Sequence, residues 1–297
     1  MGRLDDEWAL HRPAVFGAAY RITGSVADAE DVAQDVWLRA TARGSLDDVR
    51  DLRAWLITVA ARRAYDLLGS AHARRVDYVG PWLPEPLLTG PDAAEPVLVD
   101  ETAGTAMLLV LEELSPPERV AFVLHQAFGV PYDAIAEVLG RTPAACRQLA
   151  SRARRKIAAA SPARPAGTAE RDRAPAERDR VLREFRAAYE RRDEAALLAL
   201  LDPDATYTTD GGGHVFAARK IIEGAGRVAT ALLRVAVRQR FALVPAEVNG
   251  EAALLVRNRA GRLAAVDTVE VRDGRIVAVR RVLNPEKLAA ARAALGW

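Results

Sequence analysis

One stretch near the middle of the chain, residues 131–157, restricts the fold more than any other segment. Its pattern predicts a short amphipathic helix, a turn of about three residues, and a second helix with one strongly basic face. Gly140 suits the left-handed residue that ends a helix, Thr142 suits the next N-cap, and Pro143 suits the first helical position. These signals predict a helix-turn-helix, whose second helix can lie in the major groove of DNA.

The second helix of this motif has an apolar side and a basic side. The residues at helical spacing that form the apolar stripe are Cys146, Leu149, Ala150, Ala153 and Ile157. The candidates for DNA contact are polar residues in the turn and on the other faces: Arg141, Thr142, Arg147, Gln148, Ser151, Arg152, Arg154 and Arg155. Among them, Arg147, Gln148 and Ser151 are placed best for base edges. The alternative is a basic helix that only faces solvent.

The composition limits the class of protein. A chain of 297 residues with 50% hydrophobic residues suggests two or three domains with sizeable cores. The net charge is only +2, so DNA affinity has to come from local patches. The single cysteine, Cys146, excludes an internal disulfide and a cysteine-cluster zinc site, and we expect no metal or cofactor. We find no apolar run long enough to span a membrane and no signal region, so we expect a cytoplasmic protein.

Helical periodicity dominates the first 160 residues. Helices are expected over about Asp5–Thr23, Ala27–Ala42, Asp51–Gly69 and Thr102–Leu114, followed by a helix opened by Ser115 and by the helix-turn-helix. Five prolines within residues 76–101 forbid a continuous helix there, which predicts an extended tether. Residues 161–179 are charged and poor in apolar groups, which predicts a second linker.

The pattern changes after residue 180. A helix is expected to about Leu201 and another over about Ala217–Leu233. Strands are then expected over Phe241–Val244, Ala252–Arg257, Leu263–Arg272 and Arg275–Leu283. The pairs Asn249-Gly250 and Asp273-Gly274 are strong hairpin signals. Helices followed by an antiparallel meander predict an α+β domain.

With these pieces in place, the first 160 residues resemble a sigma factor of the extracytoplasmic-function type. Residues 27–42 are similar to the helix by which such factors dock on RNA polymerase. Residues 53–67 resemble the segment that recognises the promoter −10 element, and the helix-turn-helix resembles the −35 reader. The resemblance implies that residues 1–75 are sigma region 2 and that residues 102–160 are sigma region 4.

The rest of the chain extends the resemblance. Three segments are similar to signature motifs of one subgroup: Trp82-Leu83-Pro84-Glu85-Pro86, Asp210-Gly211-Gly212-Gly213-His214 and Asn284-Pro285-Glu286-Lys287-Leu288. The subgroup carries a fused C-terminal domain of SnoaL-like, NTF2-like fold, here residues 180–297. The chain departs from the pattern at His214, where Lys is usual, and at Glu286, where Asp is usual. The implied fold is two all-α sigma domains, the second a helix-turn-helix, followed by an α+β cone.

The resemblance also implies contact residues in region 2. Those for the −10 element are Arg50, Asp51, Arg53, Thr58, Arg62, Arg63, Asp66, Arg74 and Arg75. Those for core RNA polymerase are Asp28, Asp31, Gln34, Asp35, Val36 and Trp37. The acidic residues of the second set share one helix face and suit a protein partner better than DNA, although a solvated face is the alternative.

The leading hypothesis is an alternative sigma factor, not an enzyme, whose own C-terminal domain modulates its activity. Its partners would be core RNA polymerase and promoter DNA, and no membrane. The C-terminal domain would dock near the tether, on Trp82 and the 210–214 loop, and would set how the two DNA-binding halves are spaced. Trp82 is then an anchor for docking, or it merely covers a local apolar patch. The glycines at 211–213 allow either a close backbone approach or a plain flexible loop.

The alternative hypothesis is a DNA-binding regulator fused to an NTF2-like enzyme or small-molecule sensor. A small-molecule ligand would then occupy the C-terminal pocket. The candidate pocket groups are Tyr207, Asp210, His214 and Asp267.

Overall fold

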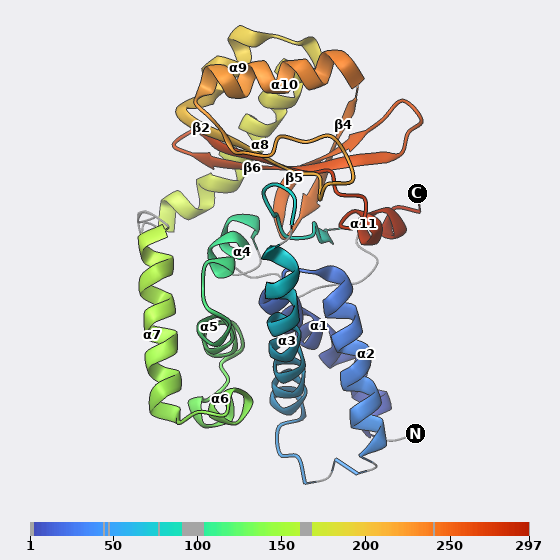
Figure 1. Ribbon diagram of the computed structural model, residues 1–297, viewed down its shortest axis with the longest axis vertical. Helices are drawn as coiled ribbons and strands as arrows, with labels where there is room; N and C mark the ends of the chain where they lie inside the picture. The colour runs from blue at the N-terminus through green and yellow to red at the C-terminus, as the bar shows by residue number, and fades with distance from the viewer. Residues whose placement is uncertain are drawn as a thin grey trace. The chain divides into compact units, whose positions relative to one another are not determined.

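The computed structural model describes residues 3–43, 45–46, 48–76, 78–90, 104–160, 168–239 and 241–296. The chain divides into two compact units, Met1–Val76 with Glu95–Ala163 and Asp77–Ala94 with Arg164–Trp297. We call the first the helical unit and the second the sheet unit (Figure 1). Residues 78–90, which belong to the predicted tether, therefore pack with the sheet unit. The finer domain boundaries given above stay predictions.

The helical unit contains seven described helices. They are α1 (Arg3–Thr23), α2 (Val26–Ala42), α3 (Leu52–Val76), α4 (Thr105–Glu112), α5 (Pro116–Phe128), α6 (Tyr132–Leu139) and α7 (Pro143–Ala160). The Ser25 side chain accepts a hydrogen bond from the Asp28 backbone N–H and so caps α2, as the spacing predicts. Helix α3 runs past the expected end at Gly69, because residues 70–76 contain neither glycine nor proline.

Helix α5 joins the two halves of the helical unit. Its first turn is fixed by a capping box between Ser115 and Glu118. The buried Arg119 guanidinium donates to the Ile22 carbonyl of α1 at 2.8 Å and to the Glu112 carboxylate at 2.7 Å. The last turn of α1 also places the Arg21 guanidinium over the Phe128 ring, 5.4 Å from its centroid. Helices of the predicted regions 2 and 4 thus share one packed body.

The sheet unit combines four described helices with a mixed sheet. The helices are α8 (Thr168–Arg191), α9 (Glu194–Leu200), α10 (Ala225–Gln239) and α11 (Ala289–Ala294). The strands are β1 (Leu88–Thr89), β2 (Leu201–Asp210), β3 (Ile222–Glu223), β4 (Ala242–Val248), β5 (Glu251–Arg257), β6 (Leu263–Arg272) and β7 (Arg275–Val282). They follow the order β1-β4-β5-β6-β7-β2-β3, and α8, α9 and α10 cover one face (Figure 1).

The core lies between that face and the three helices. Phe185 and Tyr189 from α8 and Leu232 from α10 pack against strand residues such as Val256 and Val279, all of them buried. The α+β fold predicted for this part of the chain is confirmed.

Three expected helix boundaries in the sheet unit are wrong. Residues 168–179, expected in a linker, belong to α8. The single helix expected to Leu201 is broken where Arg192 adopts φ 58°, and Asp193 starts α9 by accepting a hydrogen bond from the Ala196 N–H. The helix expected from Ala217 begins only at Ala225, because Gly224 adopts φ 90° just before it.

The sheet also contains strands that the predicted antiparallel meander lacks. Strand β2, which has no counterpart in the sequence-based expectation, pairs with β7 in parallel. Residues 88–89 of the tether add an edge strand, β1, antiparallel to β4. The predicted hairpins are present at Asn249-Gly250 and Asp273-Gly274, where both non-glycine residues adopt positive φ.

Candidate functional site

The helix-turn-helix has the local structure that its sequence predicts. Gly140 ends α6 in the left-handed conformation, with φ 60°. The Thr142 hydroxyl accepts a hydrogen bond from the Ala145 N–H at 3.2 Å and caps α7. All five residues of the predicted apolar stripe are buried, and all eight candidates for −35 contact are exposed. The basic face of α7 is therefore open to a partner.

One carboxylate fixes the orientation of α7 against α5. Glu118 is buried, and it accepts hydrogen bonds from Lys156 at 2.8 Å and from Arg152 at 3.3 Å. Burial alone would raise its pKa, but the hydrogen bonds from Lys156, Ser115 and Arg152 outweigh burial and lower the pKa to about 2. Arg152 thus has a structural partner inside the domain besides its predicted role at DNA.

The low pKa of Glu118 predicts an acid-sensitive region 4. In the unfolded chain a glutamate titrates near 4.3, so the Glu118 contribution is complete above that pH and is lost as the pH falls toward about 2. Glu118→Gln should lower the melting temperature at pH 7. It should also make the melting temperature fall less steeply as the pH drops from 4.5 to 2. Melting curves followed by circular dichroism measure both effects. Glu137→Gln, on α6, is the control; an equal flattening there would contradict the assignment.

The −10 candidates lie along α3 and in the segment before it. Arg50, Asp51, Arg53, Arg62 and Asp66 are exposed. Asp51 also accepts a hydrogen bond from the Ala54 N–H, which caps α3, and the half-buried Thr58 hydroxyl donates to the Ala54 carbonyl. The side chains of Arg74 and Arg75 lie outside the described residues.

The polymerase candidates divide into exposed and packed residues. Asp31 and Gln34 are exposed on α2, and Asp28 is half-buried. Asp35 accepts a hydrogen bond from the Arg63 Nε at 2.9 Å, so a predicted polymerase contact and a predicted DNA contact pair with each other. The remaining two candidates, Val36 and Trp37, pack against other residues of the helical unit. Val36 is fully buried, which corrects its assignment to a contact surface, and Trp37 packs on Trp8 with ring centroids 5.1 Å apart.

In the sheet unit, the three signature motifs meet at the fully buried carboxylate of Asp210. One Asp210 oxygen accepts hydrogen bonds from the Tyr78 hydroxyl and the Gly212 N–H, and the other from the Leu83 N–H at 2.8 Å. Lys287 is a further donor to the same carboxylate, because its Nζ lies 2.7 Å from the second Asp210 oxygen. The end of β2 therefore binds both the tether and the C-terminal motif.

Lys287 is the second centre of this cluster, which we call the tether site. Its ammonium group also donates to the Leu83 carbonyl at 2.6 Å. It lies over the rings of Trp82 and Tyr78, 4.2 and 4.8 Å from their centroids. Asn284 donates to the Tyr78 hydroxyl at 3.1 Å. The tether is thus held by a buried charge pair, two aromatic rings and backbone hydrogen bonds.

The two departures from the family pattern lie at the rim of this site. His214 is exposed, and its Nε2 lies 3.5 Å from the exposed Glu286 carboxylate. Tyr78 is the main contributor that the sequence did not reveal, because a lone tyrosine after a helix carries no pattern.

The glycines of the second motif allow a close approach within the chain. A Cβ atom on Gly212 would lie 2.3 Å from the Asn284 side-chain nitrogen, and the residue adopts φ 60°. A Cβ atom on Gly211 would lie 2.7 Å from the Val215 carbonyl oxygen. Of the two interpretations left open above, the close backbone approach describes these positions.

Gly212→Ala should therefore disturb the tether site. Strain at positive φ and the clash with Asn284 should cost about 1–3 kcal/mol of folding free energy. Urea unfolding followed by Trp fluorescence measures this loss. Gly226→Ala is the matched control, because its Cβ meets nothing within 4 Å in α10 and should be neutral or slightly stabilising. Equal stability of the two variants would contradict the proposed packing.

The four candidate pocket groups of the alternative hypothesis do not share a pocket. Asp210 belongs to the tether site, and His214 is exposed at its rim. Asp267 and Tyr207 instead face the core on the other side of the sheet. There the Arg281 guanidinium binds the Asp267 carboxylate through two hydrogen bonds of 2.7 and 2.6 Å.

This interior charge pair is fully buried. Arg281 lies between the rings of Tyr189 and Tyr207, 5.8 and 5.9 Å from their centroids. Burial opposes the charge of Arg281, but the Asp267 carboxylate outweighs it and raises the arginine pKa. Burial also raises the pKa of Tyr207. Asp267 and Tyr207 are therefore buried in the core of the sheet unit, with almost no surface open to a ligand.

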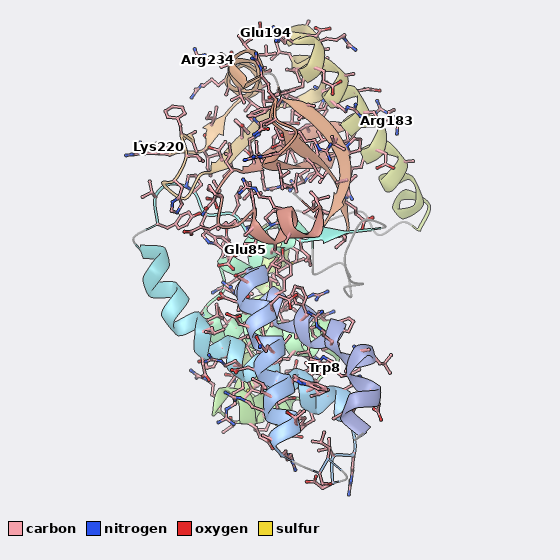
Figure 2. All side chains as sticks on the ribbon, turned by 90° about the vertical axis from the view of Figure 1, so that its right-hand side faces the viewer. Trp8, Glu85, Arg183, Glu194, Lys220 and Arg234 are labelled. Atoms are coloured by element: carbon pink, nitrogen blue, oxygen red, sulfur yellow. The ribbon has the colours of Figure 1, made fainter. Side chains whose placement is uncertain are left out.

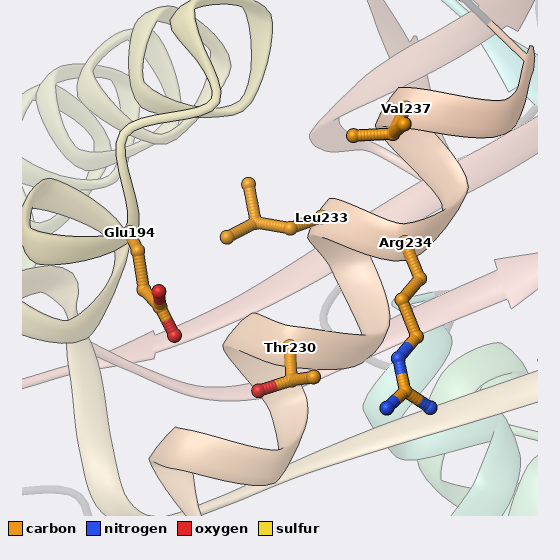
Figure 3. Close-up of a pocket in the computed structure, with 5 residues that line it drawn as sticks. All are labelled: Glu194, Thr230, Leu233, Arg234 and Val237. Atoms are coloured by element: carbon orange, nitrogen blue, oxygen red, sulfur yellow. The ribbon is translucent and has the colours of Figure 1, made fainter.

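Two hollows lie elsewhere on the sheet unit. A groove of about 490 Å³ is lined by residues of α8, β1, β4 and β5, among them Leu88, Leu182, Leu254 and Arg183. A second hollow of about 340 Å³ lies between α9 and α10, where Leu233 projects toward the helix that carries Glu194 (Figure 3). Arg234 points away from Glu194 there, so no charge pair crosses the hollow.

The described part of the chain lacks two other kinds of feature. No group of three or more His, Cys, Asp or Glu side chains within it is arranged to hold a metal ion. No helix among these residues has the length and apolarity needed to cross a bilayer.

Comparison with known proteins decides the family. The family model of Sigma-70 region 2 matches residues 8–74, and that of Sigma-70 region 4 matches residues 105–157. The ECF RNA polymerase sigma factor SigJ of Mycobacterium tuberculosis is 40% identical over 95% of this chain and 92% of its own length. The chain belongs to the extracytoplasmic-function (ECF) sigma factor family. This sigma factor is also 36% identical to the probable ECF sigma factor SigI of the same organism, over 97% of this chain and 96% of SigI.

The comparison of structures extends over the whole sigma factor. The crystal structure of M. tuberculosis SigJ matches it with a TM-score of 0.77 and 36% identity, over 96% of this chain and 98% of that one. The protein is therefore an alternative sigma factor with two helical sigma domains and a C-terminal α+β domain. As a sigma factor it acts with core RNA polymerase on promoter DNA.

Proposed function

We propose that the sheet unit controls this sigma factor by holding the tether between regions 2 and 4. The observation that carries the proposal is the capture of residues 78–89 by Asp210, Lys287 and strand β4. The signature motifs are then parts of one tether-binding site. We further propose that the exposed candidates on α3 and α7 contact the −10 and −35 elements, and that Asp31 and Gln34 on α2 contact polymerase.

Chain length gives the proposal its physical basis. The −10 and −35 elements lie roughly 25 base pairs apart, which is about 85 Å of B-DNA. Residues 77–104 join α3 to α4 and, fully extended, reach at most about 100 Å. When the sheet unit holds residues 78–89, the part that can extend shrinks to residues 90–104, which reach about 50 Å. Capture of the tether thus limits how far region 4 can separate from region 2.

The packing of the helical unit also supports control through the tether. Arg119 of α5 donates to the α1 backbone, so region 4 contacts region 2 directly. A compact unit of about 145 residues has a radius of gyration of only about 15 Å, far too small to span both promoter elements. Promoter binding therefore requires the two regions to separate, and the tether sets the limit of that separation.

Reconstituted transcription tests the proposal. A promoter is first selected from random-sequence DNA with the full-length protein and core RNA polymerase. Run-off transcription then compares the full chain with truncations that end at residues 160 and 283. The truncation at 283 removes Lys287, so both shortened proteins should differ from the full chain in promoter output while still binding core polymerase. Equal output from all three proteins would contradict control by the sheet unit.

A ligand-sensing role has one supporting observation. Leu88 and Thr89 of the captured tether line the groove beside α8, so a small apolar molecule bound there would touch the tether strand itself. Thermal shift measurements against a metabolite library, repeated with Leu254→Trp to fill the groove, test this second function. Stabilisation that survives the filling variant would place the ligand elsewhere.

A further inference from the structure

The loop between β2 and β3, residues 211–221, carries an unexplained apolar surface. We call it the basic loop. The Phe216 side chain is 96% exposed, Ile221 is 51% exposed and Val215 is 39% exposed. Clustered apolar side chains at the surface of a folded domain mark a binding site more often than single ones do. Neither the tether site nor the predicted promoter contacts involve Phe216.

The exposure of Phe216 comes from a defined loop structure. The Thr209 hydroxyl donates to the Ala218 carbonyl at 3.2 Å and accepts from the Ala218 N–H at 2.9 Å. The His214 N–H donates to the Gly211 carbonyl at 3.0 Å. These bonds fix both sides of Phe216, so the loop presents the ring outward at little conformational cost to a partner.

The charge of the basic loop selects the class of partner. No acidic residue occurs between Asp210 and Glu223, whereas Arg219 and Lys220 are both exposed. No described carboxylate forms an ion pair with either cation, and Lys220 points away from the sheet unit (Figure 2). An aromatic ring next to two cations suits single-stranded nucleic acid, whose bases stack on the ring while its phosphates pair with the cations.

The length of the covalent chain limits how far the start of the tether, on which the loop rests, can lie from the end of α3. A Cβ atom on Gly213 would lie 3.3 Å from Val79, and one on Gly80 would lie 3.7 Å from the Arg219 Cα, so the loop rests on the start of the tether. Val79 is three positions after Val76, the end of α3, so their Cα atoms lie at most about 11 Å apart. That end of α3 carries Arg74 and Arg75, the predicted contacts to the DNA backbone.

We propose that the basic loop is a third promoter contact, which binds the opened strand beside the −10 element. Arg219 and Lys220 pair with phosphates, and Phe216 stacks on an unpaired base. The proposal rests on the predicted −10 role of α3 and on the sigma activity of the chain. It also requires that the loop stays on the tether, but it does not require that capture of the tether limits the separation of regions 2 and 4.

Binding measurements on the holoenzyme test the loop. The probe is a fluorescein-labelled duplex of the selected promoter with an unpaired bubble at −10. Phe216→Ala should weaken binding about tenfold and leave the salt dependence unchanged. The double variant Arg219→Ala/Lys220→Ala should weaken binding and reduce the slope of log K against log salt by about 1–1.5.

Matched controls come from the same unit. Val237→Ala removes another exposed apolar side chain, and Arg259→Ala/Arg262→Ala removes two exposed cations at the β5–β6 turn. Both should behave like the wild type. A duplex with a bubble of unrelated sequence is the second probe. It measures the contacts of the basic loop that do not depend on recognition of the selected promoter.

Two results would overturn the proposal. The first is equal DNA affinity of the loop variants and their controls on both probes. The second is a Phe216→Ala defect in binding core polymerase without DNA, which would make the loop a protein contact. Photo-crosslinking from p-benzoylphenylalanine at position 216 distinguishes the partners directly: the label should transfer to the DNA strand. A wild-type holoenzyme that selects no promoter would contradict the −10 assignment, which is a separate failure.

Discussion

Replacing Asp210 by Asn should release the tether and destabilise the sheet unit by about 3–5 kcal/mol, because the buried Lys287 ammonium then loses its ion pair with the Asp210 carboxylate. The amide can still accept from the Leu83 N–H, so the loss reports the charge and not the shape. A loss of this size corresponds to a fall in the melting temperature of about 10 °C. Thermal unfolding of the full chain measures the stability.

Chymotrypsin measures the release of the tether. Tyr78 and Trp82 are protected while they pack around Lys287, and cleavage after them should become rapid in the Asp210→Asn variant. Glu286→Gln, an exposed change in the same motif, should leave both the melting temperature and the cleavage rate unchanged. The losses of stability caused by Asp210→Asn and Lys287→Met should not be additive, since both substitutions remove the same ion pair. Additive effects, or protection that survives, would contradict the tether site.

Replacing Asp267 by Asn should destabilise the sheet unit as much as Asp210→Asn does, although Asp267 lies on the opposite face of the sheet. The Arg281 charge would remain in the core without a partner, which costs about 3–5 kcal/mol. The Tyr189 and Tyr207 rings would remain beside the guanidinium, but burial raises the pKa of both tyrosines, so neither supplies a negative charge in place of the carboxylate. Urea unfolding gives the free energy.

The double replacement distinguishes a structural pair from a functional one. Asp267→Leu with Arg281→Met removes both charges and fills similar volume, so most of the lost stability should return. If transcription by the double variant equals that of the wild type, the pair serves only the core. A double variant that stays as unstable as Asp267→Asn would show that the core needs the charges, against this interpretation.

The local elements were predictable because their signals are local. The end of α6 at Gly140, the cap at Thr142 and the buried stripe of α7 follow from neighbouring residues, and all three were predicted. The same holds for the Asn249 and Asp273 turns. The start of α8 was not predicted, because a charged helix carries little apolar periodicity in its first turns.

The rest depended on contacts between distant residues. Strand β2 has few apolar residues and pairs with β7, some 70 positions later, so no local pattern marks it. The resemblance to a family supplied the three motifs, but it did not show that they converge on Asp210. Tyr78 and Arg281 were missed for the same reason, since a buried tyrosine or arginine is defined only by the partners that the fold brings to it. Val36 was assigned to a surface by its neighbours on α2, whereas its own side chain completes the core.

Spacing-dependent transcription tests control through the tether most directly. A series of the selected promoter, with spacers between the −35 and −10 elements lengthened and shortened base by base, is transcribed by holoenzymes of the wild type and of Tyr78→Phe/Trp82→Ala. These substitutions weaken capture of the tether without unpairing Asp210 and Lys287. A captured tether predicts a narrow optimum for the wild type and a broader one, extended to longer spacers, for the variant. Superimposable spacing profiles from two equally stable proteins would contradict the account.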